Sequence, residues 1–171
     1  MQLLTFTIGA EDYAIESRRV VEVVPFVAAR TIPRTPDFIR GIFTHRGRLI
    51  PLVDLGWLLI DKPLRETLST RVIVVEFSLA PHSIGTGDQR IRLGMAAENV
   101  VSLCSSAEVE TSLPALPTPE APALAPDLGR LLRIGGRTVQ VLDVERLLPV
   151  TLLAGLVAPT PASTGDQSAS Y

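Results

Sequence analysis

The sequence predicts a mainly β protein made of two small barrel-like lobes, and three observations lead to this expectation. Short apolar and β-branched runs recur along the chain, roughly five in each stretch of some 65 residues. So many short strands favour barrels, because closing a sheet removes its exposed edges. Aromatic residues make up only 5% of the chain, so Val, Leu and Ile must build the core. The third observation is an internal repeat, which gives two lobes and a seam between them where a partner could bind.

The repeat has two parts. Residues 46–59 match residues 135–148 at an offset of 89, so that Gly47 corresponds to Gly136 and Asp54 to Asp143. Upstream, the offset is 80: residues 13–15 match 93–95, and residues 20–23 match 100–103. The difference of 9 between the offsets means that the second copy carries extra residues, in the Pro-rich stretch 114–126.

The first copy predicts five strands and one helix. Strands are expected at residues 3–8, 13–15, 20–24, 39–45 and 49–53, and a helix at 55–60. The dipeptide Arg46-Gly47 with Arg48 forms a tight hairpin turn, since Gly47 can take positive φ.

The second copy predicts a similar series. Strands are expected at residues 71–77, 91–96, 100–104, 131–134 and 138–142, with helices at 144–148 and 151–157. Residues 105–127 read as an irregular loop and 158–171 as a disordered tail. We expect a single domain at 1–157 with lobes at about 1–70 and 71–150, and an exchange of strands between the lobes is left open. The runs 20–24 and 72–75 are apolar on both faces, which predicts burial on both sides.

Bulk composition argues against several classes of function. The net charge of −2, without a basic stripe, gives no sign of a nucleic-acid or anionic-membrane partner. No apolar run reaches the roughly 18 residues that cross a bilayer, and the first residues read as a strand rather than a signal peptide. Cys104 is the only cysteine, which suits a reducing cytoplasm. Two histidines and one distant cysteine provide no metal-ligand spacing, and no cofactor motif occurs, so no metal or cofactor is expected.

Two aspartates invite a catalytic interpretation. Asp54 and Asp143 each end a strand and precede an expected short helix, so helix capping is favoured over acid–base chemistry. A small enzyme using Asp54 or Asp143 with His45 stays an alternative, although His45 reads as an exposed strand end. Cys104 is interpreted as a core or strand residue rather than a nucleophile.

Two features point to protein binding. The arginines of the turn at 46–48 form either a solvated tip or a contact, since Arg is favoured at interfaces. Glu22 is expected on an outer strand face with Val20 and Val24, as a charge among apolar residues.

These residues resemble the CheW family of chemotaxis coupling proteins. The resemblance rests mainly on the run from Pro33 to Leu55, which includes Arg46-Gly47 and Pro51-Leu52-Val53-Asp54, and on residues 13–15, 20–23 and 141–148. It covers roughly residues 3–150.

The resemblance implies two SH3-like five-stranded barrels on a shared apolar core, and a non-enzymatic cytoplasmic adaptor recruited to receptor clusters. Its implied partners are the cytoplasmic tip of a methyl-accepting chemoreceptor and the regulatory domain of a CheA-type histidine kinase, which has the same fold. The residues carried over as contacts are Val20, Glu22, Gly41, Arg46 and Val72, with Gly47 beside Arg46.

The sequence also departs from the family pattern. Thr44-His45 replace the usual Asn-Leu, residues 96–98 differ, and the loop at 78–90 is long. These departures suit a divergent pathway that does not control motility. A self-associating regulatory module that binds no receptor is the remaining alternative.

Overall fold

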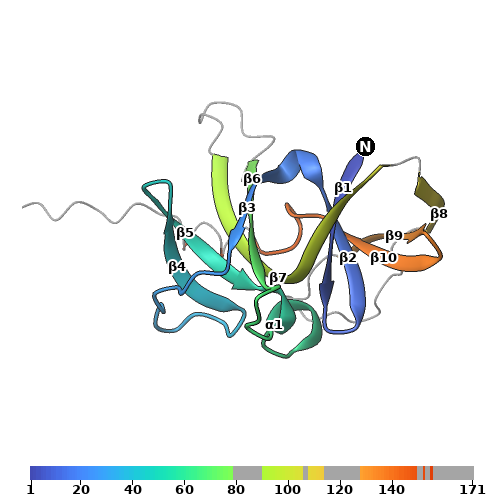
Figure 1. Ribbon diagram of the computed structural model, residues 1–171. Coiled ribbons are helices and arrows are strands. Elements are labelled where there is room, and N and C mark those ends of the chain that lie inside the picture. Colours follow the sequence, from blue (N-terminus) through green and yellow to red (C-terminus); the bar gives the residue numbers. More distant parts are fainter. Residues whose placement is uncertain (79–89, 106–107, 114–127, 150–151, 153–154, 156–171) are drawn as a thin grey trace, which may run out of the picture.

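The computed structural model describes residues 1–78, 90–105, 108–113, 128–149, 152 and 155, and most of these lie in β-strands (Figure 1). The first half of the chain contains β1 (Gln2–Ile8), β2 (Glu11–Glu16), the short 3-10 helix η1 (Ser17–Arg19), β3 (Val20–Pro25), β4 (Ile39–His45), β5 (Arg48–Asp54) and α1 (Leu55–Ile60). The second half contains β6 (Arg71–Ser78), β7 (Arg90–Ser105), β8 (Val109–Leu113), β9 (Leu128–Ile134) and β10 (Arg137–Leu142).

All five strands and the helix predicted in the first half are confirmed to within two residues at each end. Three expectations in the second half are wrong. The strands predicted at 91–96 and 100–104 are one strand, β7, which continues through Asn99 at φ 44°. Asn tolerates this left-handed conformation, so a turn-like residue bends the strand without ending it.

The other two corrections concern residues 105–127 and 144–148. The predicted irregular loop contains β8, which pairs with β9. The predicted helix at 144–148 is a turn, in which the Arg146 amide donates to the Asp143 carbonyl. The expected helix at 151–157 lies largely outside the described residues, where Leu152 and Gly155 are helical, and the expected tail lies wholly outside them.

The strands form two curved sheets that share β7, which runs from one into the other (Figure 1). One sheet has the order β3-β6-β7-β5-β4, and the other β7-β1-β2-β10-β9-β8. Each sheet therefore takes strands from both halves of the chain: the early hairpin β1–β2 joins the late hairpin β9–β10, and β6–β7 joins β4–β5. From here on, the first lobe means the sheet β3-β6-β7-β5-β4, and the second lobe means the sheet β7-β1-β2-β10-β9-β8.

The sequence repeat appears as a repeat of strand register. Leu52 of β5 pairs in parallel with Gly94 of β7, and Val141 of β10 pairs in parallel with Ala14 of β2. Val141 follows Leu52 by 89 residues, and Gly94 follows Ala14 by 80 residues. The two parallel pairs are therefore equivalent positions of the repeat. The hairpins β4–β5 and β9–β10 also share five residue pairs at the offset of 89, including His45–Arg48 with Ile134–Arg137 and Ile39–Val53 with Leu128–Leu142.

The large core lies where the two sheets meet. Strand β6 contributes Val72 to Val75, all without solvent exposure, as predicted for a strand buried on both sides. Strand β3 departs from the prediction, since Val20 and Val24 pack on the core but Val21 and Val23 are exposed. A smaller core under the second sheet includes Leu3, Ala14 and Leu132, and Cys104 packs against it, as expected for a strand residue.

Candidate protein-binding surfaces

The hairpin β4–β5 ends in a two-residue turn. Arg46 and Gly47 have φ values of 48° and 76°, as in the turn whose twist matches that of paired strands. The second hairpin has Gly135 and Gly136 at the same places, with φ values of 55° and 75°. A non-glycine residue costs about 1 kcal/mol in this conformation. Arg46 bears this cost, whereas the equivalent residue of the second hairpin, Gly135, does not.

Glu22 lies at the centre of a small polar cluster formed with this turn. Its Oε2 accepts a hydrogen bond from His45 Nε2 at 2.9 Å and lies 3.0 Å from Arg46 Nη2. Glu22 is half-buried on the face of β3 that also carries Val20 and Val24, which is the inward face rather than the predicted outer one. The two arginines of the turn region, Arg46 and Arg48, therefore differ, because Arg46 forms an ion pair with Glu22.

His45 was expected to be exposed, but it is 6% exposed. A carboxylate only accepts hydrogen bonds, so Nε2 carries the proton in the contact with Glu22. Its other ring nitrogen, Nδ1, is buried and has no hydrogen-bond partner among the described residues. The sequence offers one signal for this burial, since His45 precedes a hairpin turn on a strand with an alternating pattern.

The pKa of Glu22 lies below its ordinary value of 4.5, chiefly because of the hydrogen bond from His45, with a further contribution from the charge of Arg46 and some opposition from burial. A carboxyl group with a lowered pKa stabilises the fold fully above its unfolded pKa, and this stabilisation is lost as pH falls through the folded pKa. We therefore expect Glu22→Gln to make the loss of stability in acid less steep.

Thermal unfolding measured between about pH 6 and pH 3 checks this expectation. Glu11→Gln, at an exposed strand end, is the matched control and should follow the wild-type profile. Equal acid slopes for Glu22→Gln and the wild type would show that the cluster contributes nothing to stability.

The remaining residues carried over from the family differ in their exposure. Val72 is fully buried in β6, and Gly41 is buried in β4, so neither residue can contact a partner while the chain is folded. Gly41 has a φ of 136°, and a Cβ there would lie 2.0 Å from the Arg30 carbonyl oxygen. Val20 is partly buried against the core. These three residues shape the lobe, while Glu22 and Arg46 reach its surface.

Two exposed apolar pairs were missed from the sequence. On β3, Val21 and Val23 are 37% and 38% exposed, and on the last part of β7, Val101 and Leu103 are 76% and 61% exposed. The offset of 80 relates the first pair to the second. Among the described strands, β3 pairs only with β6, and residues 102–105 pair only with β1, so both pairs lie on sheet edges. The repeat could have indicated that these two pairs occupy equivalent positions, although it says nothing of their exposure.

Asp54 has no solvent exposure and caps α1. Its Oδ1 accepts from the amides of Gly56 at 2.8 Å and Trp57 at 3.2 Å, and its Oδ2 accepts from Arg40 Nε at 2.7 Å. The predicted capping role is therefore confirmed for Asp54, whereas Asp143 precedes a turn rather than the predicted helix, so the same prediction is wrong there. His45 lies at the other end of the same hairpin, roughly 20 Å away for a strand of this length. The structure therefore does not bring Asp54 and His45 together, as the catalytic alternative would require.

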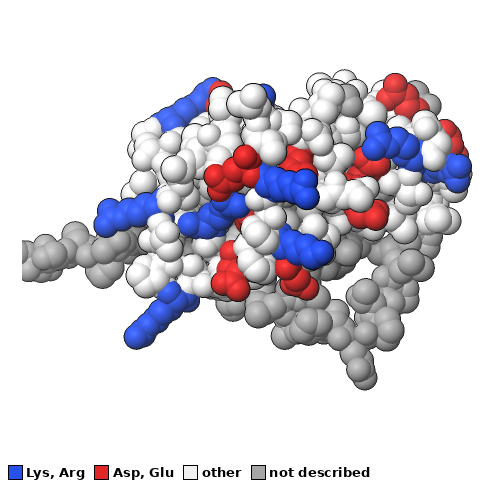
Figure 2. All heavy atoms as spheres, turned by 60° about the horizontal axis from the view of Figure 1, so that its bottom comes forward, with Lys and Arg blue, Asp and Glu red and all other residues white. Residues whose placement is uncertain are grey.

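The described residues hold no group of three His, Cys, Asp or Glu side chains placed to bind a metal ion. Within the same residues, no helix is long and apolar enough to cross a membrane. Basic and acidic side chains lie intermixed on the face drawn in Figure 2.

Comparison with known proteins identifies relatives over nearly the whole chain. The family described as "CheW-like domain" matches residues 2–151. The "Chemotaxis protein CheW" of Klebsiella aerogenes is 31% identical over 149 residues, which cover 86% of this chain and 81% of the relative. "Protein FrzA" of Myxococcus xanthus is 33% identical over 73 residues, covering 43% of this chain and 46% of that protein.

A solved structure shares the fold. The crystal structure of the scaffolding protein TtCheW from Thermoanaerobacter tengcongensis aligns with a TM-score of 0.62 at 22% identity, covering 85% of this chain and 86% of that one. The likeness confirms the mainly β fold class, and two SH3-like lobes are consistent with it.

Proposed function

Because this chain belongs to the CheW family, we propose that it is an adaptor that couples methyl-accepting chemoreceptors to a CheA-type histidine kinase. Proteins of this family are non-enzymatic scaffolds, and this chain is not an enzyme. As a finer proposal, it acts in the cytoplasm at receptor clusters, in a pathway that does not control motility. The departure of Thr44-His45 from the family pattern motivates that last step. In the structure, His45 forms a hydrogen bond with Glu22, which leucine could not form.

The observation that carries the proposal is the pair of apolar sheet edges. Each lobe exposes two apolar side chains at a sheet edge: Val21 and Val23 on β3, which pairs only with β6, and Val101 and Leu103 on the last part of β7, where the described pairing is with β1 alone. Exposed apolar edges are docking surfaces for other β structures. A regulatory kinase domain of the same fold could therefore contact both lobes, and one adaptor would join two kinase domains.

The Glu22–His45–Arg46 cluster lies on β3 as well, but on the opposite face from Val21 and Val23. We propose that Glu22, Arg46 and Gly47 form a second, polar contact with the receptor tip or the kinase. The left-handed conformation of Arg46 supports a functional role, since strained residues that persist are often functional.

Such an adaptor works by position rather than by chemistry. A receptor that changes conformation shifts the equilibrium of the kinase only if it contacts the two kinase states differently. Weak interfaces that recur in an array act together, because each bound neighbour raises the effective concentration of the next.

The test is calorimetric titration of the protein with the regulatory domain of its cognate kinase, and separately with the receptor tip. We expect saturable kinase binding in the micromolar range, weakened about tenfold or more by Val23→Lys and by Leu103→Lys, because a charge in an apolar contact is desolvated without a partner. Leu68→Lys, at a residue that is 96% exposed and outside both edges, is the matched control.

Wild-type affinity in both edge variants would rule out the edges as kinase interfaces. Absence of binding by the folded wild type, together with a molecular mass above that of the monomer, would favour the self-associating module. Kinase binding without receptor binding would restrict the adaptor to the kinase side.

A further inference from the structure

The two hairpins differ at one position inside the repeat. Arg40 and Gly41 form a bulge between the pairs Ile39–Val53 and Gly41–Leu52 of β4–β5. The register of β9–β10 shifts at the same place, between the pairs formed by Gln140 and Leu142. The offset of 89 places Gly129 where Arg40 stands, and Asp143 where Asp54 stands.

In the first lobe, the side chain of Arg40 fills the space in front of the aspartate. Its Nε and Nη2 lie 2.7 and 2.6 Å from Asp54 Oδ2, and its Nη1 lies 2.5 Å from Glu66. The guanidinium also stacks at 5.3 Å over the ring of Phe26. This lobe therefore supplies its own arginine to its own aspartate.

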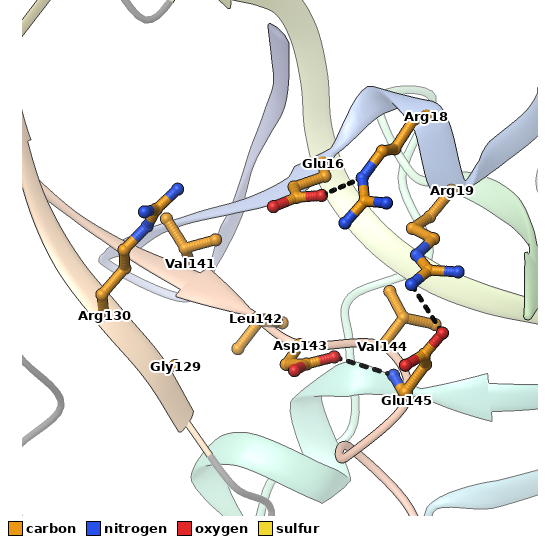
Figure 3. Close-up of a pocket in the computed structure, with 10 residues that line it drawn as sticks. All are labelled: Glu16, Arg18, Arg19, Gly129, Arg130, Val141, Leu142, Asp143, Val144 and Glu145. Carbon is orange, nitrogen blue, oxygen red and sulfur yellow. Dashed lines mark hydrogen bonds and ion pairs between the residues drawn. The ribbon is translucent and has the colours of Figure 1, made fainter. Parts of the chain in front are cut away.

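In the second lobe, no side chain fills the space in front of the aspartate. Gly129 packs its backbone against β10, where a Cβ would lie 2.5 Å from the Val141 carbonyl oxygen. A pocket of about 360 Å³ lies between Gly129, the end of β10, η1 and the turn after β10 (Figure 3). That volume lies at the lower end of the roughly 300–1,000 Å³ found for ligand pockets. The polar wall includes Asp143, and the apolar lining comes from Val141, Leu142 and Val144.

The carboxylate of Asp143 keeps part of its bonding capacity. Its Oδ1 accepts from the Glu145 amide at 3.1 Å, which repeats the bond from Gly56 to Asp54. No ion pair to Asp143 occurs among the described residues. Arg18 interacts with it electrostatically but forms its ion pair with Glu16, and Arg19 pairs with Glu145 at 2.5 Å. The remaining cation of the pocket, Arg130, donates to the sulfur of Met1.

We propose that this pocket is a docking site for the guanidinium group of an arginine side chain supplied by a partner protein. The guanidinium would take the place that Arg40 takes in the first lobe and donate to Asp143, while the stem of the arginine packs along Val141 and Val144. Arginine suits this role because its planar fork pairs with a carboxylate through two bonds. The site does not depend on which kinase or receptor the protein binds.

The test is a titration of the full chain with N-acetyl-L-arginine N-methylamide, followed by amide NMR. We expect weak, saturable binding in the millimolar range, with the largest shifts at the amides of Gly129, Asp143 and Glu145. Asp143→Asn should weaken this binding at least fivefold. Asp12→Asn, the same substitution at a residue that pairs with Arg137 outside the pocket, should leave the binding unchanged.

A second comparison uses the wild type alone and needs no variant to fold. The corresponding citrulline derivative has the same shape without the charge, so it should cause no saturable shifts. Equal shifts from citrulline, shifts away from the pocket, or unchanged binding in a folded Asp143→Asn would overturn the proposal. Tighter binding of free L-arginine than of N-acetyl-L-arginine N-methylamide would overturn the proposal that a partner protein supplies the arginine, and would indicate a small-molecule ligand.

Discussion

Replacement of Asp54 by alanine is expected to lower the free energy of unfolding by about 3 kcal/mol, because it removes the partner of a half-buried guanidinium together with the cap of α1. Asp54 has no exposure, and it accepts bonds from Arg40 and from two amides at the start of the helix. The amide of Leu64 lies 3.3 Å from both of its oxygens. Urea denaturation measures the effect.

The matched control is Asp143→Ala, at the equivalent residue of the repeat. Asp143 is exposed and accepts one amide, so its loss should cost only about 1 kcal/mol. Loss of accepted amide bonds alone predicts a cost near 1 kcal/mol at either position. Equal costs for the two variants would therefore show that the contacts of Asp54 with Arg40 and Leu64 add nothing to stability.

Gly41→Ala is expected to cost about 3 kcal/mol or more, the second large effect. A Cβ at Gly41 would lie 2.0 Å from the Arg30 carbonyl oxygen, and this atom belongs to backbone that is held by the bridge between Arg30 and Ile42. The φ of 136° adds strain for any residue with a side chain. Thermal and urea unfolding should both show the loss.

Gly47→Ala is the control for backbone strain without a clash. Gly47 has a φ of 76°, and nothing lies within 4 Å of a Cβ added there. Its replacement should cost about 1 kcal/mol. If Gly41→Ala were no more costly than Gly47→Ala, the close approach to Arg30 would not constrain the fold. We expect any loss of partner binding in Gly41 variants to follow the loss of stability.

The sequence pattern predicted the local elements that depend on neighbouring residues. The turn at Arg46-Gly47, the strands on either side of it and the cap at Asp54 all follow from turn chemistry and alternation, and all are confirmed. The pattern failed at Asn99, where a residue that often ends strands is accommodated within β7 by pairing with β6 on one side of the bend and with β1 on the other. It also failed at residues 109–113, because β8 gains its strand conformation from β9 rather than from its own polar sequence.

The candidate surface was only partly predictable. Glu22 and Arg46 were identified, and Glu22 was correctly placed on the same face of β3 as Val20 and Val24, but that face is the inward one. Alternation says which side chains share a face, and only the packing of the sheets decides which face is buried. Burial of His45 depends on Glu22, which lies 23 residues earlier in the chain. The exposed pairs on β3 and β7 depend on which strands end each sheet, and a local pattern carries no information about sheet order.

The repeat in the sequence was enough to predict the same hairpin twice, because the offset of 89 preserves the turn, the strand register and the aspartate that follows the second strand. The pairing of each hairpin with strands from the other half of the chain depends on long-range burial, which local residue preference does not encode. The tertiary structure also decided the fate of the two equivalent aspartates. Asp54 is enclosed because Arg40 lies opposite it, and Asp143 borders an open pocket because Gly129 contributes no side chain.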